Sequence, residues 1–104
     1  MMMYGGTLSG VKVVNSDWVK TATTPVKYAT PMQNNDNFGY GYQWWIPSDG
    51  NGEYQGMGIF GQILYINPEK HIVIVQSASW PKPEMNERWE ESSKLMDSIV
   101  KEFN

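Results

Sequence analysis

The chain has 104 residues, eight basic against eleven acidic ones, a net charge of −3, no cysteine and one histidine. A chain of this length holds one domain at most, and its thinly spread charges give no basic surface for nucleic acid or for a membrane. No apolar run reaches the roughly 20 residues of a membrane span. Because disulfides and thiolate metal sites need cysteine, we expect no metal and no other cofactor.

Two short helical segments are predicted near the start of the chain. Met1 to Tyr4 followed by Gly5 is typical of the last turn of a helix, because glycine tolerates the left-handed conformation that ends many helices. Ser16 and the aspartate after it are expected to cap a second helix that runs to about Ala22. A helix that ends at residue 4 has almost no beginning, which suggests a piece of something larger.

The middle of the chain predicts a loop and then a strand. Thr23 to Phe38 is rich in Thr, Pro, Asn and Gln and indicates a long surface loop. Tyr40 to Ile46 alternates aromatic residues with glycine and glutamine, which is typical of a strand. Ser48 to Gly52 is a cluster of turn-forming residues.

The most strand-like part of the chain follows three closely spaced glycines, at positions 56, 58 and 61. The runs Ile63 to Ile66 and Ile72 to Val75 are apolar at every position, the pattern of strands covered on both faces. Asn67 to Lys70 lies between them and favours a tight turn, with Pro68 fixing the bend. The two runs therefore predict an antiparallel hairpin, with the glycines as a flexible stretch ahead of it.

The last predicted element is an amphipathic helix from Asn86 to Phe103. Its apolar positions recur at helical spacings and are Met85, Trp89, Met96, Ile99, Val100 and Phe103. This stripe is expected to pack across one face of the hairpin. The predicted fold class is thus α+β, a single domain over residues 1–104 in which an antiparallel sheet of hairpin and aromatic strand packs against a C-terminal helix. The other face of the hairpin needs a cover, so we expect either a missing N-terminal portion or a second copy as partner.

Several short motifs follow one another in a specific order along the chain. They are Gly5-Gly6, Gly10 to Val14, Asp17-Trp18-Val19, Gly39 to Trp45, Gly58 to Gln62 and Asn67 to Lys70. This ordered set resembles the C-terminal third of the serine β-lactamase and penicillin-binding-protein-like hydrolases, nearest to the branch of class C β-lactamases, esterases and aminohexanoate-dimer hydrolases. The resemblance implies a partial β-lactamase/transpeptidase-like fold, whose helical domain would supply the second cover. Most members of the family are exported, which implies a periplasmic or secreted location that nothing in this chain specifies.

The resemblance implies acyl transfer to the serine of a Ser-x-x-Lys motif, assisted by a Tyr-x-Asn motif. The chain matches the first at Ser9 to Lys12 and Ser98 to Lys101, and the second at Tyr65 to Asn67. The first match lies in a glycine-rich turn, the second on the solvent face of the last helix, and the third runs from a strand into a turn. We interpret all three as chance, so the catalytic nucleophile and base are absent and the chain alone is predicted to be inactive.

The strand motif that lines the family's site should fall on or near Gly56-Met57-Gly58, where this chain has neither lysine nor histidine. A backbone N–H donor to an oxyanion survives that change, because it needs no particular side chain. Matching the motifs of the family to this chain implies that the oxyanion donor is the backbone N–H of Ile59, with Gln62 as the second choice. The full set predicted to line the oxyanion and the substrate is Gly58, Ile59, Phe60, Gly61 and Gln62. The alternative is that the glycines only allow a bulge where a strand begins.

Two further features have open interpretations. Tyr40, Tyr42, Trp44 and Trp45 form either a surface on which carbohydrate stacks or ordinary packing between elements. His71 is expected to be exposed at the start of a strand. The predicted function is that of a C-terminal fragment of a β-lactamase-like serine hydrolase, whose parent cleaves an ester, an amide or a β-lactam. The alternative is a self-standing binding or oligomerisation module without catalysis.

Overall fold

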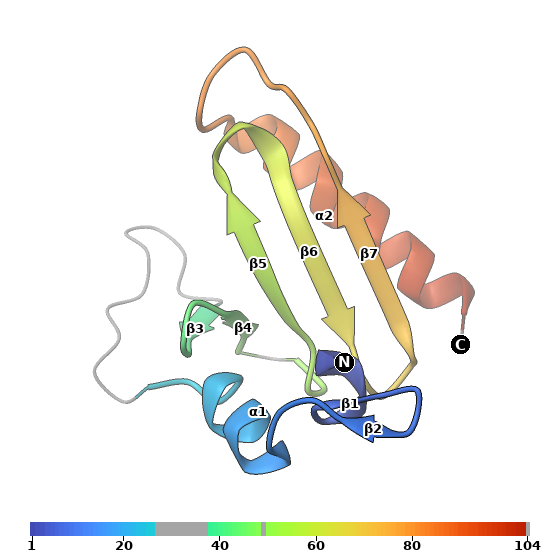
Figure 1. Ribbon diagram of the computed structural model, residues 1–104. Coiled ribbons are helices and arrows are strands. Elements are labelled where there is room, and N and C mark those ends of the chain that lie inside the picture. The colour runs from blue at the N-terminus through green and yellow to red at the C-terminus, as the bar shows by residue number, and fades with distance from the viewer. Residues whose placement is uncertain (27–37, 49, 104) are drawn as a thin grey trace.

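A five-stranded antiparallel sheet forms the centre of the computed structural model, which describes residues 1–26, 38–48 and 50–103 (Figure 1). In spatial order its strands are β3 (Phe38–Tyr40), β4 (Trp45–Pro47), β5 (Tyr54–Gly58), β6 (Gln62–Asn67) and β7 (Ile72–Gln76). The helix α2 (Asn86–Glu102) lies behind the sheet in this view. The N-terminal elements lie near one end of the sheet and are the turn η1 (Met2–Tyr4), the paired strands β1 (Thr7–Leu8) and β2 (Val11–Lys12), and the helix α1 (Ser16–Ala22).

The predicted hairpin is confirmed as β6 and β7, which pair in register from Ile63 opposite Gln76. Asn67 fixes the turn between the two strands. Its side-chain oxygen accepts a hydrogen bond of 3.0 Å from the Lys70 N–H, and its amide donates one of 3.1 Å to the Tyr65 hydroxyl. Tyr65 and Asn67 are both buried, so the Tyr-x-Asn match is part of the turn and the core rather than of a reactive site.

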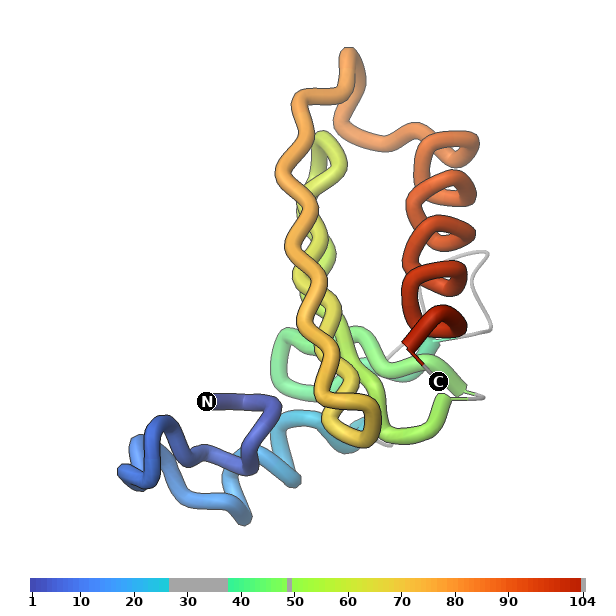
Figure 2. Tube along the Cα trace, turned by 90° about the vertical axis from the view of Figure 1, so that its right-hand side faces the viewer, coloured from blue at the N-terminus to red at the C-terminus, as the bar shows by residue number. Residues whose placement is uncertain are grey.

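The core lies between α2 and one face of the hairpin, and Figure 2 shows the sheet and the helix as two layers. Its members are Ile63, Tyr65, Ile74, Trp89, Met96 and Val100. The predicted apolar stripe of the last helix is therefore largely correct. Phe103 is the exception, with 69% of its surface exposed. The reason is visible in Figure 1, where the C-terminal end of α2 projects past the edge of β7.

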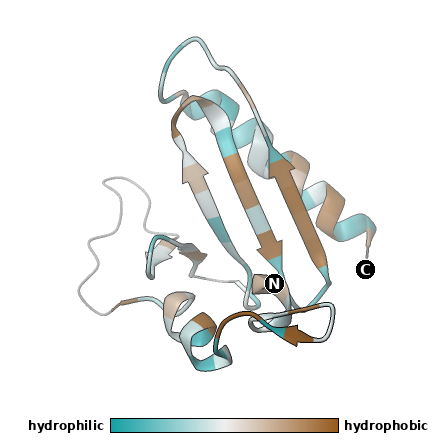
Figure 3. Cartoon of the chain, in the orientation of Figure 1, coloured by the Kyte–Doolittle hydropathy of each residue, from teal (hydrophilic) through white to brown (hydrophobic). Residues whose placement is uncertain are grey.

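The opposite face of the hairpin is only partly covered. Because side chains alternate along a strand, the residues between the core positions point away from α2. Ile66 is buried among them, whereas Leu64, Val73 and Val75 have 36%, 48% and 68% of their surfaces exposed. Figure 3 shows the apolar character of β6 and β7 on which these residues lie. We call the surface formed by these three residues the bare face.

The prediction of one aromatic strand over Tyr40 to Ile46 is wrong. The segment is a tight hairpin of β3 and β4, closed by a hydrogen bond of 2.8 Å from the Gly41 N–H to the Trp44 carbonyl. Gln43 has a φ of 65°, in the left-handed region, and this reverses the chain. Gly41 lies so close to the Ala22 carbonyl that a side chain at this position would overlap it. Contact with α1 therefore makes the chain turn where the alternating pattern predicted a continuing strand.

The glycine-rich stretch is not a flexible entrance to the hairpin but a strand and a turn. Gly56 and Gly58 belong to β5, which pairs with β6 residue for residue from Tyr54 opposite Ile66 to Gly58 opposite Gln62. This regular register leaves no place for a bulge, so that alternative is wrong. The three-residue turn η2 (Ile59–Gly61) then joins β5 to β6.

The N-terminal predictions are confirmed with one shift. The turn η1 ends at Gly5, whose φ of 61° is the expected left-handed cap. The helix α1 covers the predicted residues, but its cap is Asn15, one residue before the predicted Ser16. The Asn15 side-chain oxygen accepts a hydrogen bond of 3.0 Å from the Asp17 N–H. Most of the loop predicted over Thr23 to Phe38 lies outside the described residues.

Two buried tyrosines of the sheet give the first prediction. The Tyr54 hydroxyl has no hydrogen-bond partner among the described residues, whereas the Tyr65 hydroxyl accepts from Asn67. Removing an unpaired buried hydroxyl is harmless, while removing one partner of a buried pair leaves the other unsatisfied. We expect Tyr54→Phe to leave the free energy of unfolding unchanged or to raise it by up to about 1 kcal/mol, and Tyr65→Phe to lower it by about 1–2 kcal/mol. Urea denaturation measures both, and the reverse order would contradict the assignment.

The same pair predicts a dependence on alkaline pH. Burial raises the pKa of Tyr54 above its ordinary value of 10.0. Burial also raises the pKa of Tyr65, which the hydrogen bond from Asn67 lowers and the charges of Glu53 and Asp97 raise. A raised pKa in the folded state gives stability that is present below the unfolded pKa and is lost as pH rises through the folded one. The free energy of unfolding should therefore fall as pH rises above 10.0, and less so in Tyr54→Phe.

Candidate functional site

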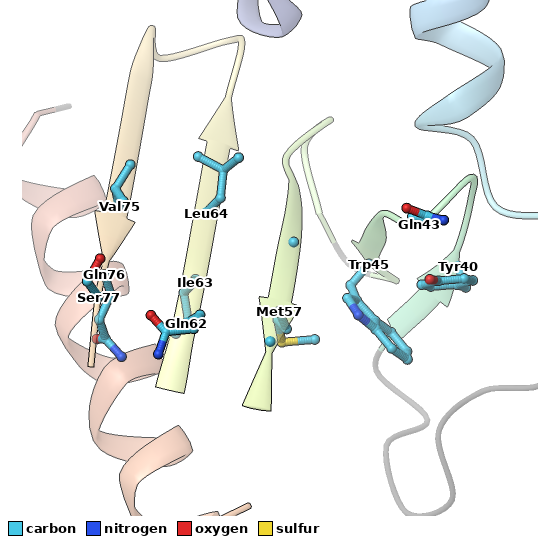
Figure 4. Close-up of a pocket in the computed structure, with 12 residues that line it drawn as sticks. Tyr40, Gln43, Trp45, Met57, Gln62, Ile63, Leu64, Val75, Gln76 and Ser77 are labelled. Atoms are coloured by element: carbon cyan, nitrogen blue, oxygen red, sulfur yellow. The ribbon is translucent and has the colours of Figure 1, made fainter. Parts of the chain in front are cut away.

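A surface cavity of about 520 Å³ lies along the sheet where β5 diverges from the β3–β4 hairpin (Figure 4). Its lining residues come from β3 to β7 and the segments that join them, and are Tyr40, Gln43, Trp45, Gly56, Met57, Gly58, Gln62, Ile63, Leu64, Val75, Gln76 and Ser77. Two of the predicted site residues, Gly58 and Gln62, are among them. The other three, Ile59 to Gly61, form η2 directly beyond the end of β5. Gly58 and Gln62 therefore line the cavity, whereas Ile59, Phe60 and Gly61 are not among its lining residues and only adjoin them along the chain.

The turn η2 has an unusual backbone conformation. Phe60 has φ 62° and ψ 19°, in the left-handed region that a bulky residue rarely adopts. Its N–H donates a hydrogen bond of 2.8 Å to the Pro83 carbonyl, and its own carbonyl accepts one of 3.3 Å from the Trp80 N–H. Ile59 is exposed, while Gly61 is buried. The segment between β7 and α2 thus fixes η2 through two backbone hydrogen bonds to Phe60.

The Gln62 side chain joins the start of β6 to the same segment. Its amide nitrogen donates to the Ala78 carbonyl and, over 3.4 Å, to the Phe60 carbonyl. Its amide oxygen accepts a hydrogen bond of 3.3 Å from the Ala78 N–H. Gln76 adds a bond of 2.9 Å from its amide nitrogen to the Gly61 carbonyl. Both glutamine amides are thus used to fix the backbone around η2.

Among the described residues, neither serine of the two Ser-x-x-Lys matches lies at the cavity. Ser9 is exposed in the turn between β1 and β2, and the Ser98 hydroxyl donates a hydrogen bond of 2.8 Å to the Lys94 carbonyl within α2. Ser77 does line the cavity, but the described lining residues include no lysine, histidine or carboxylate that could act as its base. Activation of a serine needs such a neighbour. Within the described part of the chain there is also no group of three or more His, Cys, Asp or Glu that could hold a metal ion.

The aromatic residues of the β3–β4 hairpin lie in two different environments. Trp44 packs edge-on against Tyr54, with ring centroids 5.0 Å apart, and so belongs to the packing between elements. Tyr40 and Trp45 lie 4.6 Å apart and line the cavity, as Figure 4 shows. Sequence reasoning did not include them in the site, because their place depends on the unpredicted β3–β4 hairpin. His71 is exposed as expected, in the turn before β7, with its ring 5.9 Å from that of Tyr4.

Residues that support η2 were also missed. Trp80 is buried against η2 and packs edge-on against Trp89 of α2, with ring centroids 4.8 Å apart. Gln76 lies at the end of β7. The only signal in the sequence was an isolated tryptophan between two prolines and a strand, which does not indicate what it covers. Of the described helices, none combines the length and apolar character needed to cross a membrane.

A curated relative and a solved structure with the same printed name both match the chain, while no protein-family model matches it. The chain is 33% identical over 92 residues to the 6-aminohexanoate-dimer hydrolase of Paenarthrobacter ureafaciens, and this match covers 81% of the chain but 23% of that protein. A solved structure from Bacillus anthracis, to which the same name is provisionally given, superposes with a TM-score of 0.76 and 26% identity. That match covers 95% of this chain and 25% of the other.

The chain therefore spans about a quarter of the length of the proteins that it matches. The expected resemblance to the β-lactamase-like hydrolases is confirmed in both sequence and fold. The sequence match and the structural match both relate the chain to the 6-aminohexanoate-dimer hydrolases. The chain fits the C-terminal part of a β-lactamase-like hydrolase.

Proposed function

We propose that this chain forms one wall of the acyl-transfer site of a serine hydrolase, in which η2 presents the Ile59 N–H to the acyl oxygen. The observation that carries the proposal is the fixed turn at the end of the cavity, in a chain related to 6-aminohexanoate-dimer hydrolases. A backbone N–H held in place is the kind of donor that stabilises a developing oxyanion, because it needs no rearrangement during the reaction. Donation by a backbone N–H suits this part of the cavity, where Gly56 and Gly58 leave the backbone accessible.

The remaining chemistry has to come from outside this chain. A serine supplied by other polypeptide would attack the carbonyl carbon, a neighbouring base would take its proton, and the carbonyl oxygen would gain the negative charge. The leaving group would depart with a proton, and water would release the acyl group. The lining residues that the structure describes contribute no base to these steps. We therefore infer that the chain alone does not catalyse acyl transfer.

The cavity also bears on the substrate class. Its described lining residues include no lysine or arginine, so they offer no cation to a substrate carboxylate. Tyr40, Trp45 and Met57 provide apolar surface, and Gln43 provides an amide. These groups suit an uncharged, extended part of a substrate. The name of the Paenarthrobacter relative refers to a dimer of 6-aminohexanoate, and we propose a linear amide in preference to an ester or a β-lactam.

We further propose that the bare face is a docking surface for the rest of the hydrolase fold. Gly56 lies opposite Leu64, which lies opposite Val75, so the three share one face of the sheet. Glycine within a strand often marks a place where another backbone approaches closely. The share of the relatives' length that this chain leaves uncovered is large enough to contain such a cover. A second copy is the alternative cover, and it would favour the oligomerisation module.

The first test of the proposed function is covalent labelling. The purified chain should show no adduct with a fluorophosphonate or a β-lactam in intact-mass spectrometry, because its serines lack a base. A β-lactamase labelled in parallel shows that the reagents are active. A stoichiometric adduct at Ser9, Ser77 or Ser98 would contradict the proposal.

A second test removes only the proposed donor. In Ile59→Pro the N–H is lost, while Gly58 already has the extended backbone (φ −122°, ψ 156°) that suits a residue before proline. The host is a chimera in which this chain replaces the matched quarter of the Bacillus anthracis protein. We expect Ile59→Pro to lower kcat/KM for an ester or amide by about 10²–10³-fold, as loss of an oxyanion donor does elsewhere. Ile59→Val is the matched control, and equal activity of the two variants would remove Ile59 from this role.

A third test concerns the bare face. The chain should bind an apolar dye such as ANS, and Val75→Asp should weaken that binding because it places a charge in the apolar surface. Val13→Asp is the control, since Val13 is 54% exposed and follows β2, outside the β6–β7 hairpin. Sedimentation of the same samples separates the two covers. A monomer that binds dye agrees with the proposal, whereas a dimer that Val75→Asp dissociates would favour the oligomerisation module instead.

A further inference from the structure

We propose that Gln62 and Trp80 are positioning residues that hold η2, and with it the peptide group of the proposed donor Ile59, in its observed conformation. The inference rests on the proposed function for its purpose, but the lock itself is a property of this chain. This role accounts for the contacts that the segment between β7 and α2 makes with η2, although the two are well separated in the sequence.

The turn needs a lock because its conformation is intrinsically unfavourable. Phe60 is a non-glycine residue in the left-handed region, which persists only where surrounding groups determine it. Without its partners, Phe60 would relax toward an ordinary conformation and change the direction of the preceding peptide group. That peptide group is next to the one that carries the Ile59 N–H. The position of the proposed donor therefore depends on what holds Phe60.

Gln62 holds Phe60 directly and also secures the segment behind it. Its side-chain amide pairs with both the N–H and the carbonyl of Ala78, as a neighbouring strand would, and its nitrogen also reaches the Phe60 carbonyl. The Gln62 side chain thus forms hydrogen bonds both to Phe60 and to the segment between β7 and α2 that contacts Phe60. A residue of the same size without an amide would lose all three hydrogen bonds.

Trp80 holds the other end of the turn. Its N–H donates to the Phe60 carbonyl, and its indole ring occupies the space next to Gly61 in which a side chain would stand. Gly61 also has a φ of 89°, so both backbone and space require glycine. Because the indole packs edge-on against Trp89, the turn is fixed relative to α2 and the core.

The test uses the isotope-labelled chain and the substitution Gln62→Leu. We expect amide hydrogen exchange at Phe60 and Trp80 to become at least about ten-fold faster, equivalent to about 1.4 kcal/mol, and the Phe60 Cα shift to lose its left-handed value. Amides in the β6–β7 ladder should keep their protection. Gln55→Leu is the control, since Gln55 is a partly buried residue of β5 whose amide donates to the Met57 sulfur. Trp80→Phe, which keeps an aromatic ring beside Gly61, should have a smaller effect.

A second readout ties the lock to the donor. Methylphosphonate is a tetrahedral anion, and its titration should shift the Ile59 amide resonance of the wild-type chain and do so at least about ten-fold more weakly in Gln62→Leu. Unchanged exchange and unchanged Phe60 shift in Gln62→Leu would overturn the lock and leave the proposed function intact. A wild-type Ile59 amide that does not respond to the anion would instead count against the proposed function, with the lock judged by exchange alone.

Discussion

The packing of α2 against one face of the β6–β7 hairpin is the interaction on which the other elements depend. It supplies the buried cluster around Ile63, Tyr65 and Met96, and burial of each large apolar side chain contributes about 1.5–3 kcal/mol. The β1–β2 ribbon has only two residues in each strand and could not persist alone. Since strand side chains alternate, the same packing that buries Ile63 and Tyr65 directs Leu64 away from the helix.

The core also determines where the candidate site lies. β5 is paired with β6 along its whole length, so the turn between them has a defined place at one end of the sheet. The chain leaves β7 near that end and crosses to α2, which brings Ala78, Trp80 and Pro83 behind η2. The contact between Trp80 and Trp89 then connects this crossing to the core. A turn that would be mobile in an isolated hairpin is therefore supported by the helix layer.

Sequence reasoning predicted the elements whose signal is local and periodic. The β6–β7 hairpin and α2 are continuous patterns of apolar residues with clear ends, and both were placed within a few residues. It failed where a contact distant in sequence decides the conformation. Gly41 turns because α1 lies against it, and β5 is a strand because β6 pairs with it, although Gly56 and Gly58 weaken any local preference. Support of η2 by Trp80 could not be predicted, since it depends on how the chain crosses from β7 to α2.

The alternation that leaves the bare face also explains why the cavity is built as it is. Gly56 and Gly58 stand on the same face as Leu64 and Val75, so this part of the sheet offers backbone and small apolar surface but few functional groups. Such a surface suits close contact with another polypeptide better than catalysis by its own side chains. The cavity includes Leu64 and Val75 of this surface, and its described lining residues supply no base. Under the proposed function, a single polypeptide that packed on the glycines would supply both a cover for the exposed apolar residues and the missing base.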